Sequence, residues 1–223
     1  MSAEVTSVDL QMQLAGSGWL LGEVGFSEIG ESTYVGAVWT SITDVVITNG
    51  LDLIYGISGS GPSNRVASTG TMTFELDNSA SNSAGLLGLY SPNNSNCKAG
   101  FELGIGVRLA ITYGGTTYYK WRGILSSIEP VGGVKRDRVT QCIAVDYMDD
   151  AASSLLSQVA LQIDKRSDEV FEAVYEELAR PAPATSISTG SSTFAYALDN
   201  VQDENTTVLS AFQTIALSEV GYI

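Results

Sequence analysis

Alternation of apolar and polar side chains over short segments is the feature that most limits the folds open to this chain. Val8, Leu10, Met12 and Leu14 alternate with polar residues, and the same two-residue period returns in later segments. Successive side chains of a β-strand point to opposite faces, so this period predicts strands with one buried face. The other segments that we expect to be strands are 38–49, 51–57, 70–76, 107–111, 117–125 and 139–145.

Turns and loops separate these strands. Asn49-Gly50 lies between two apolar runs and predicts a hairpin, and Gly114-Gly115 predicts a second one. Between positions 16 and 36 we expect an extended arm with a short strand, and over 58–64 a flexible loop. Residues 79–100 are expected to form a long irregular loop, a kind of segment that usually carries binding or assembly surfaces.

The period changes after residue 146, where helices are expected. The first spans 147–157, the second begins at a Ser167 cap, and the third begins at Asn205 or Thr206. The second helix carries an apolar stripe of Phe171, Val174, Tyr175 and Leu178, and the third carries one of Val208, Phe212, Ile215 and Ala216.

Strands followed by helices predict an α+β chain that is mainly β and is built of separate modules. We expect an arm or strand over 1–37, a β-domain over 38–150, and a helical segment over 151–223. That last segment would lead into a second, incomplete domain, because Gly221-Tyr222-Ile223 reads as the start of a strand. We therefore expect the natural protein to continue beyond Ile223.

Composition limits the classes of partner. The 223 residues include 25 acids and 11 bases, for a formal net charge of −14, so the chain should repel nucleic acid. No apolar run is long enough to cross a membrane, and the N-terminus has no secretory pattern. Cys97 and Cys142 imply no disulfide framework, which fits assembly in a reducing cytosol, although one bridge stays open.

The chain contains no histidine. Ser-His-Asp and Cys-His nucleophiles and histidine-based zinc sites are therefore impossible within it. We expect no catalytic residue, no cofactor and no metal, and hence no enzyme.

Two acidic groups are the remaining candidates for a metal ion. Asp146, Asp149 and Asp150 could hold a divalent ion or act as an acid–base pair, but a helix N-terminus explains them better. The 199–205 segment departs from the calcium-loop pattern, so a polar turn and helix cap are favoured there. Gly16, Gly18 and Gly22 match neither phosphate-binding glycine motif.

Aromatic and basic side chains give two candidate contact surfaces. Tyr118, Tyr119 and Trp121 could stack on sugars, but Tyr119 and Trp121 should share one strand face and so pack in the core. Lys135 and Arg136, with Arg138, form a basic cluster at an expected hairpin tip. It could contact an acidic neighbour, but a solvated turn is the favoured interpretation.

Several motifs stand in order between positions 38 and 180. They are WTSITDV at 39–45, FELDN at 74–78, LLGLYSPNN at 86–94, GVRLAITYGGTTYYKWRGILSSIEP at 106–130 and AVDYMDDAA at 144–152. With this order the chain resembles bacteriophage minor tail proteins of the tail hub or tail-tip (baseplate hub) family. The SEVGYI phrase at the end echoes the same family, in which further strands follow it.

The resemblance implies a β-barrel or sandwich related to the tail-tube fold over 38–150, and a structural role in the virion, after assembly in the host cytoplasm. A hub of this kind is expected to form a trimer that closes the distal end of the tail tube and joins it to receptor-binding parts. Its partners would be other copies, distal tail and tail-tube proteins and the tape-measure protein, with no specific nucleic-acid binding.

Assembly contacts are expected in the 86–92 loop and at the basic tip. The residues are Leu86, Leu87, Leu89, Tyr90, Pro92, Lys135 and Arg136. Aspartate in place of Leu87 and Leu89 should block assembly. Two other functions stay open: a carbohydrate-binding or adhesin β-module, and a glycosidase or peptidoglycan hydrolase that uses paired carboxylates.

Overall fold

The computed structural model describes ten stretches of the chain: residues 5–14, 18–20, 33–35, 38–46, 50–57, 66–132, 138–156, 159–178, 185–198 and 206–219. The chain forms two compact units, one of residues 1–53 and 72–144 and one of residues 54–71 and 145–223. The expected 58–64 loop, the acidic 199–205 segment and the chain end lie outside the described residues. The boundaries expected at 37 and 150 stay predictions.

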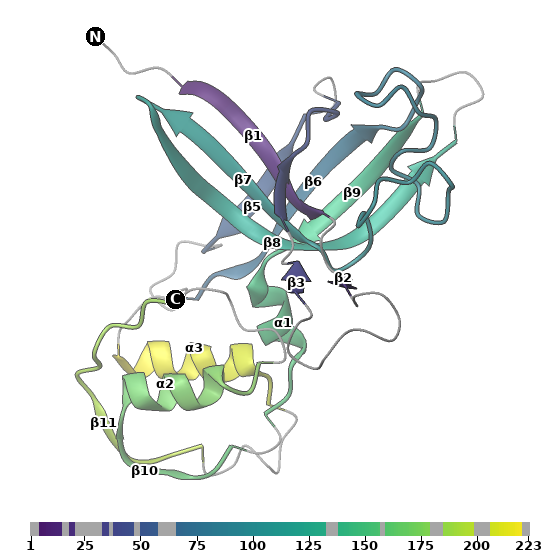
Figure 1. Cartoon of the computed structure of the whole chain (residues 1–223). Coiled ribbons are helices and arrows are strands. Elements are labelled where there is room, and N and C mark those ends of the chain that lie inside the picture. Colours follow the sequence, from purple (N-terminus) through teal and green to yellow (C-terminus); the bar gives the residue numbers. More distant parts are fainter. Residues whose placement is uncertain are drawn as a thin grey trace. The chain divides into compact units, whose positions relative to one another are not determined.

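A large sheet dominates the first unit, and its strands β1, β6, β7, β8 and β9 are seen in Figure 1. The strand order is β4-β1-β7-β8-β9-β6-β5. The strands are β1 (Val5–Leu14), β4 (Val38–Ser41), β5 (Asp52–Gly56), β6 (Ser68–Asp77), β7 (Gly106–Tyr113), β8 (Thr116–Val131) and β9 (Val139–Val145). A separate two-stranded sheet pairs β2 (Gly18–Leu20) with β3 (Thr33–Val35). The expected mainly β class with additional helices is confirmed.

Alternating residues form the core of this unit, although not every face is the predicted one. Leu10, Met12 and Leu14 of β1 are buried as expected, but Val8 is 62% exposed. In β9 the buried residues are Thr140, Cys142 and Ala144, and the expected face of Val139, Gln141, Ile143 and Val145 is not the core face. The buried cluster also contains Ile42, Met72, Phe74, Leu76, Leu89, Tyr90, Phe101, Val107, Leu109, Trp121, Leu125, Cys142 and Ala144. One face of the sheet thus supplies most of the hydrophobic stabilisation of the unit.

The segment that follows β4 runs from β1, near one edge of the sheet, to β6, near the other edge. The Ile42 amide donates to Leu10 of β1 at 2.8 Å, and the Val46 amide donates to Glu75 of β6 at 2.8 Å. The Asp77 amide of β6 also donates to the Asp44 carbonyl at 2.8 Å. These few bonds do not make a continuous ladder, so the sheet is not a closed barrel.

The hairpin expected at Asn49-Gly50 is wrong, because β4 and β5 are the two outermost strands of the sheet. Gly50 does take the positive φ of a turn glycine, +75°. However, residues 44–46 pair with β6 before the chain reaches β5. Long-range pairing therefore overrides the local hairpin signal.

The hairpin of β7 and β8 is confirmed, with Gly114 (φ +55°) and Gly115 (φ +79°) in its two-residue turn. The expected common face of Tyr119 and Trp121 is wrong. Leu109 pairs with Trp121 and Ala110 with Tyr119, so Lys120 is an extra residue in β8. Such a bulge breaks the alternation, leaving Trp121 5% exposed and Tyr119 59% exposed.

The second unit packs helices against a small hairpin. Its elements are α1 (Tyr147–Ser153), β10 (Gln162–Arg166), α2 (Ser167–Tyr175), β11 (Thr193–Ala197) and α3 (Val208–Glu219). Helices α2 and α3 lie side by side next to the β10–β11 hairpin (Figure 1). Their buried side chains are chiefly Val170, Val174, Val208, Ala211, Phe212 and Ile215, and the Phe171 and Phe212 rings stack at 4.2 Å.

Helix ends in this unit differ from the predictions. Helix α1 stops at Ser153, because the next residues bond to the segment before α3: the Leu156 amide donates to Thr206 and the Val208 amide to Ser154. The cap of α3 is Thr207, whose hydroxyl accepts from the Ser210 amide at 3.2 Å. Ser167 is the first residue of α2 and not its cap, which is Arg166. Among the described residues, no helix is both long and apolar enough to span a bilayer.

Candidate interaction surfaces

The three aspartates around α1 act in capping and packing. Asp146 is the N-cap, and its carboxylate accepts from the Met148 amide at 3.0 Å. Asp149 lies in the first turn, and Asp150 is buried. Among the described residues, no three histidine, cysteine or acidic side chains gather as metal ligands would. The arrangement agrees with the helix N-terminus interpretation.

Two substitutions of Asp146 distinguish the stability that comes from helix capping from the effect of its buried charge. Burial raises the pKa of this carboxyl, although amide hydrogen bonds from Gly70, Met148 and Asp149 oppose the shift. Asp146→Asn should therefore leave the stability of the second unit unchanged or higher, because asparagine caps as well as aspartate and carries no buried charge. Asp146→Ala should cost about 1 kcal/mol. Chemical denaturation followed by circular dichroism measures both, and stabilisation of the wild type by calcium would contradict a pure capping role.

Neither thiol is placed for nucleophilic chemistry. Cys97 and Cys142 are free, and burial raises the pKa of both, that of Cys142 to about 12. Thiolates are the reactive form of cysteine. At neutral pH the Cys142 side chain is therefore an uncharged part of the core.

The 79–100 loop is irregular, as expected, but its base is fixed by buried hydrogen bonds. The Tyr90 hydroxyl donates to the Asp44 carboxylate at 2.7 Å, and the amide and hydroxyl of Ser83 donate to the same carboxylate. Thr140 donates to the Tyr90 carbonyl at 2.8 Å. Burial raises the pKa of Asp44, but the hydrogen bonds from Tyr90 and Ser83 outweigh it, so the net shift is downward. The loop is thus built onto an ionised buried carboxylate.

The residues expected to make assembly contacts divide into three groups. Leu86 and Leu87 are each 43% exposed, and Pro92 is exposed as well. Leu89 and Tyr90 are buried in the core of their own unit, where they anchor the loop and are not available to a neighbouring subunit. Lys135 and Arg136 lie outside the described residues. Whether the exposed residues contact a neighbouring subunit stays a prediction.

A surface that the sequence did not reveal lies on the outer side of strands β1, β4, β7 and β8. We call it the arginine–aromatic patch, and it consists of Trp39, Arg108, Tyr119 and Arg122. The Arg108 guanidinium lies 4.2 Å from the centres of both the Trp39 and the Tyr119 rings. That of Arg122 lies 5.0 Å from the Trp39 ring. Arg108 also donates to the Gln11 amide oxygen at 2.6 Å.

The alternation in β7 and β8 does predict that Arg108 and Arg122 point away from the core. It does not predict that the two arginines pair directly across the strands, or that Trp39 lies against both. Those relations depend on the strand order and on the bulge at Lys120. Arg108 lies over the Tyr119 ring, and the Lys120 ammonium lies 5.3 Å from the centre of the Tyr118 ring. Cationic side chains therefore lie against the two tyrosine rings on which a sugar would have to stack.

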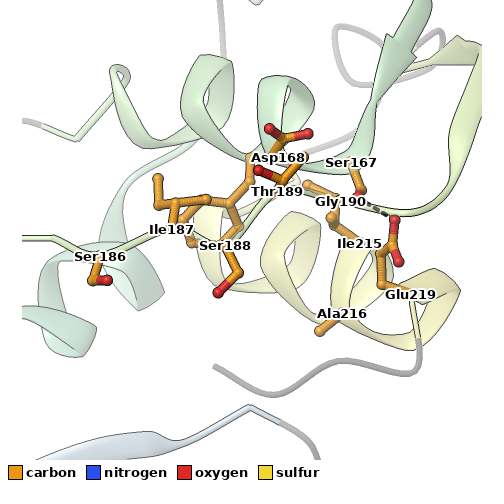
Figure 2. Close-up of a pocket in the computed structure, with 11 residues that line it drawn as sticks. Ser167, Asp168, Ser186, Ile187, Ser188, Thr189, Gly190, Ile215, Ala216 and Glu219 are labelled. Atoms are coloured by element: carbon orange, nitrogen blue, oxygen red, sulfur yellow. Dashed lines mark hydrogen bonds between the residues drawn. The ribbon is translucent and has the colours of Figure 1, made fainter.

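A pocket of about 440 Å³ lies in the second unit between α2, α3 and residues 186–190 (Figure 2). Glu219 closes one side by accepting hydrogen bonds from the hydroxyls of Ser167 and Ser191 and from the Ser192 amide. These bonds, that of Ser167 first, lower the pKa of Glu219 to about 2. The pair with Arg166 likewise lowers the pKa of Asp168 to about 2. A glycosidase needs a general acid of raised pKa, and neither carboxyl in this pocket provides one.

Comparison with known proteins shows only distant structural similarity. No family profile and no curated protein matches the sequence. The 43 kDa tail protein of prophage MuSo2 from Shewanella oneidensis aligns with a TM-score of 0.48 and 10% identity, over 96% of this chain and 50% of that chain. The lidded Francisella PdpA–VgrG complex gives a TM-score of 0.38 and 9% identity, over 86% of this chain and 23% of that chain. The half-lidded form of that complex gives a TM-score of 0.33 and 13% identity, over 85% of this chain and 27% of that chain.

The chain therefore spans half or less of the length of the solved structures to which it is similar. These similarities concern the arrangement of strands and helices, and they assign neither an activity nor a partner to this chain.

Proposed function

We propose that this chain is a structural component of a bacteriophage tail, a hub or tip protein that closes the distal end of the tail tube. It would act by binding and not by catalysis, joining the tube to distal and receptor-binding parts as a trimer that also meets the tape-measure protein. The ordered motifs of the sequence support the tail assignment. The rigid presentation of Leu86 and Leu87 is the observation that carries the assembly role.

The backbone around these leucines is held on both sides. The Asn82 side chain donates to the Leu86 carbonyl at 2.7 Å and accepts from the Leu86 amide at 3.2 Å. Asn96 donates to the Leu87 carbonyl at 3.0 Å, and the Gly88 amide donates to Asn78 at 3.1 Å. Gly88 has a φ of +84°, and an added Cβ would meet the Asn94 side chain, so only glycine fits there.

The two exposed leucines contribute no hydrophobic stabilisation to the isolated chain. Exposed leucines gain nothing from the hydrophobic effect until another surface covers them. Because the loop is already ordered, binding costs little conformational entropy. A pre-ordered loop with two adjacent exposed leucines is therefore suited to contact a neighbouring protein in an assembly.

The double variant Leu86→Asp and Leu87→Asp tests the proposal. We expect the purified chain to stay folded, with a free energy of unfolding within about 0.5 kcal/mol of the wild type, because surface substitutions rarely cost more. Phage that carry the variant should lack normal tails. Mass spectrometry of purified particles and electron microscopy of the tails measure the effect.

Leu103→Asp is the matched control, since Leu103 is 61% exposed and belongs to the same unit but not to the 79–100 loop. It should leave tails normal. Aspartate at Leu89 is no test of assembly, because it would put a charge into the core and unfold the unit. Normal, infectious tails with the Leu86 and Leu87 double variant, or absence of the wild-type chain from tails, would reject the proposal.

A further inference from the structure

We propose that the arginine–aromatic patch of one copy receives a carboxylate-lined hollow of a second copy of this chain, in a head-to-tail contact. The inference deepens the proposed function, on whose self-association it rests, by naming the two surfaces that meet.

The patch contains a pair of like charges with no ion-paired acid among the described residues. Arg108 and Arg122 are directly opposite on neighbouring antiparallel strands, an arrangement that destabilises a sheet. The chain has 25 acids against 11 bases, yet within the described part of the chain neither guanidinium forms an ion pair with a carboxylate. Among the described residues, the Trp39 and Tyr119 rings and the Gln11 amide oxygen lie against the two guanidinium groups and partly offset their charge.

The patch is also fixed in place before any partner arrives. Arg108 lies between two rings and donates to Gln11, whose amide in turn donates to the Asp9 carboxylate at 2.6 Å. Asp9 accepts a second hydrogen bond, from Ser41 at 2.8 Å. Tryptophan, tyrosine and arginine dominate the energetics of protein interfaces. A guanidinium that is already ordered loses little entropy when a carboxylate binds it.

The complementary surface lies on strands β5, β6, β8 and β9 of the same sheet. A hollow of about 280 Å³ is lined by Asp52, Glu75 and Glu129, together with Gln141 and Ile143. Asp52 and Glu129 are exposed, and neither forms an ion pair within the described stretches. Gln141 donates to Glu75 at 3.0 Å and so fixes the position of that carboxylate. Like the patch, these polar side chains alternate with core residues and face away from the core.

One copy cannot bring the two surfaces together. Arg108 lies on β7 and Glu75 on β6, three strand spacings apart in the order, which is about 14 Å. Arg122 and Glu129 lie on the same strand, seven residues and thus about 24 Å apart. Two copies can pair patch with hollow, and a head-to-tail repeat of this contact is heterologous, the type that generates a ring when its rotation closes.

Charge reversal tests the contact in the full 223-residue chain. Sedimentation velocity over a concentration series should show self-association of the wild type. Arg122→Glu and Glu129→Arg should each weaken it at least tenfold, because each places like charges across the contact. Every copy of the combined variant would carry both reversed charges, so the combination should restore association. Glu102→Arg, the same change at an exposed acid outside the hollow, should have no effect.

A wild type that stays monomeric at every concentration would overturn the contact, as would single variants that associate normally or a combined variant that is not restored. Binding of an anionic glycan through Arg122 by a monomeric chain would also overturn it in favour of another occupant. A monomeric wild type would also contradict the proposed trimer. The assignment to the tail is tested separately, by finding the chain in tails and by the Leu86 and Leu87 variant.

Discussion

Replacing Tyr90 with alanine should lower the free energy of unfolding of the first unit by about 3–5 kcal/mol, the usual cost of removing a buried aromatic side chain. Tyr90 is completely buried, and its ring packs edge-on against Phe101 with centroids 5.2 Å apart. Its removal leaves a cavity and takes a hydrogen bond from the buried Asp44 carboxylate. Denaturation followed by tryptophan fluorescence measures the loss, because all three tryptophans belong to this unit.

Tyr90→Phe is the control that keeps the ring. It removes only the hydroxyl, and Asp44 retains its two hydrogen bonds from Ser83, so the cost should be about 1–3 kcal/mol. The folded-state pKa of Asp44 lies below its unfolded value. Its ionisation thus adds stability above the unfolded pKa, and this stability is lost as the pH falls through the folded pKa.

Without the Tyr90 hydroxyl the folded-state pKa of Asp44 should rise toward its unfolded value, so the stability that depends on its ionisation should be smaller and should be fully lost at a higher pH. Carboxyl titration by nuclear magnetic resonance follows this shift. If Tyr90→Ala cost no more than Tyr90→Phe, the ring would not be the anchor of the 79–100 loop.

Replacing Phe212 with alanine should destabilise the second unit by a similar amount, about 3–5 kcal/mol. Phe212 of α3 is buried and stacks on Phe171 of α2, with the ring planes 15° apart. The stack joins the two helices that supply most of the buried side chains of this unit. Circular dichroism at the helix wavelength follows the change, since α1, α2 and α3 all belong to this unit.

Phe212→Leu is the control, since it fills most of the same volume and should cost less than half as much. Tryptophan fluorescence reports on the first unit, because no tryptophan lies in the second. If the two units unfold separately, the fluorescence transition should change little in either variant, and a fluorescence transition that moved together with the helix signal would show that they unfold together. An unchanged helix signal in Phe212→Ala would contradict the role of the stack.

Local patterns in the sequence located most of the elements. The alternation of β1, β6, β7 and β9, the Gly114-Gly115 turn and the stripe of α3 are all local, and each appears in the structure. The acidic start of α1 is also local, because a cap and its amide lie two residues apart. The lack of histidine excludes whole classes of catalytic site before any fold is known.

The tertiary structure decided which of these elements become neighbours. Alternation fixes the face on which a side chain lies, but not the strand that lies beside it. The separation of β4 from β5, the bulge at Lys120 and the burial of Leu89 under its own loop follow from long-range pairing. The arginine–aromatic patch exists because Trp39, Arg108 and Arg122 come from three strands that only the folded sheet brings together. Hydrogen bonds between residues distant in the chain select that arrangement, and no local period encodes them.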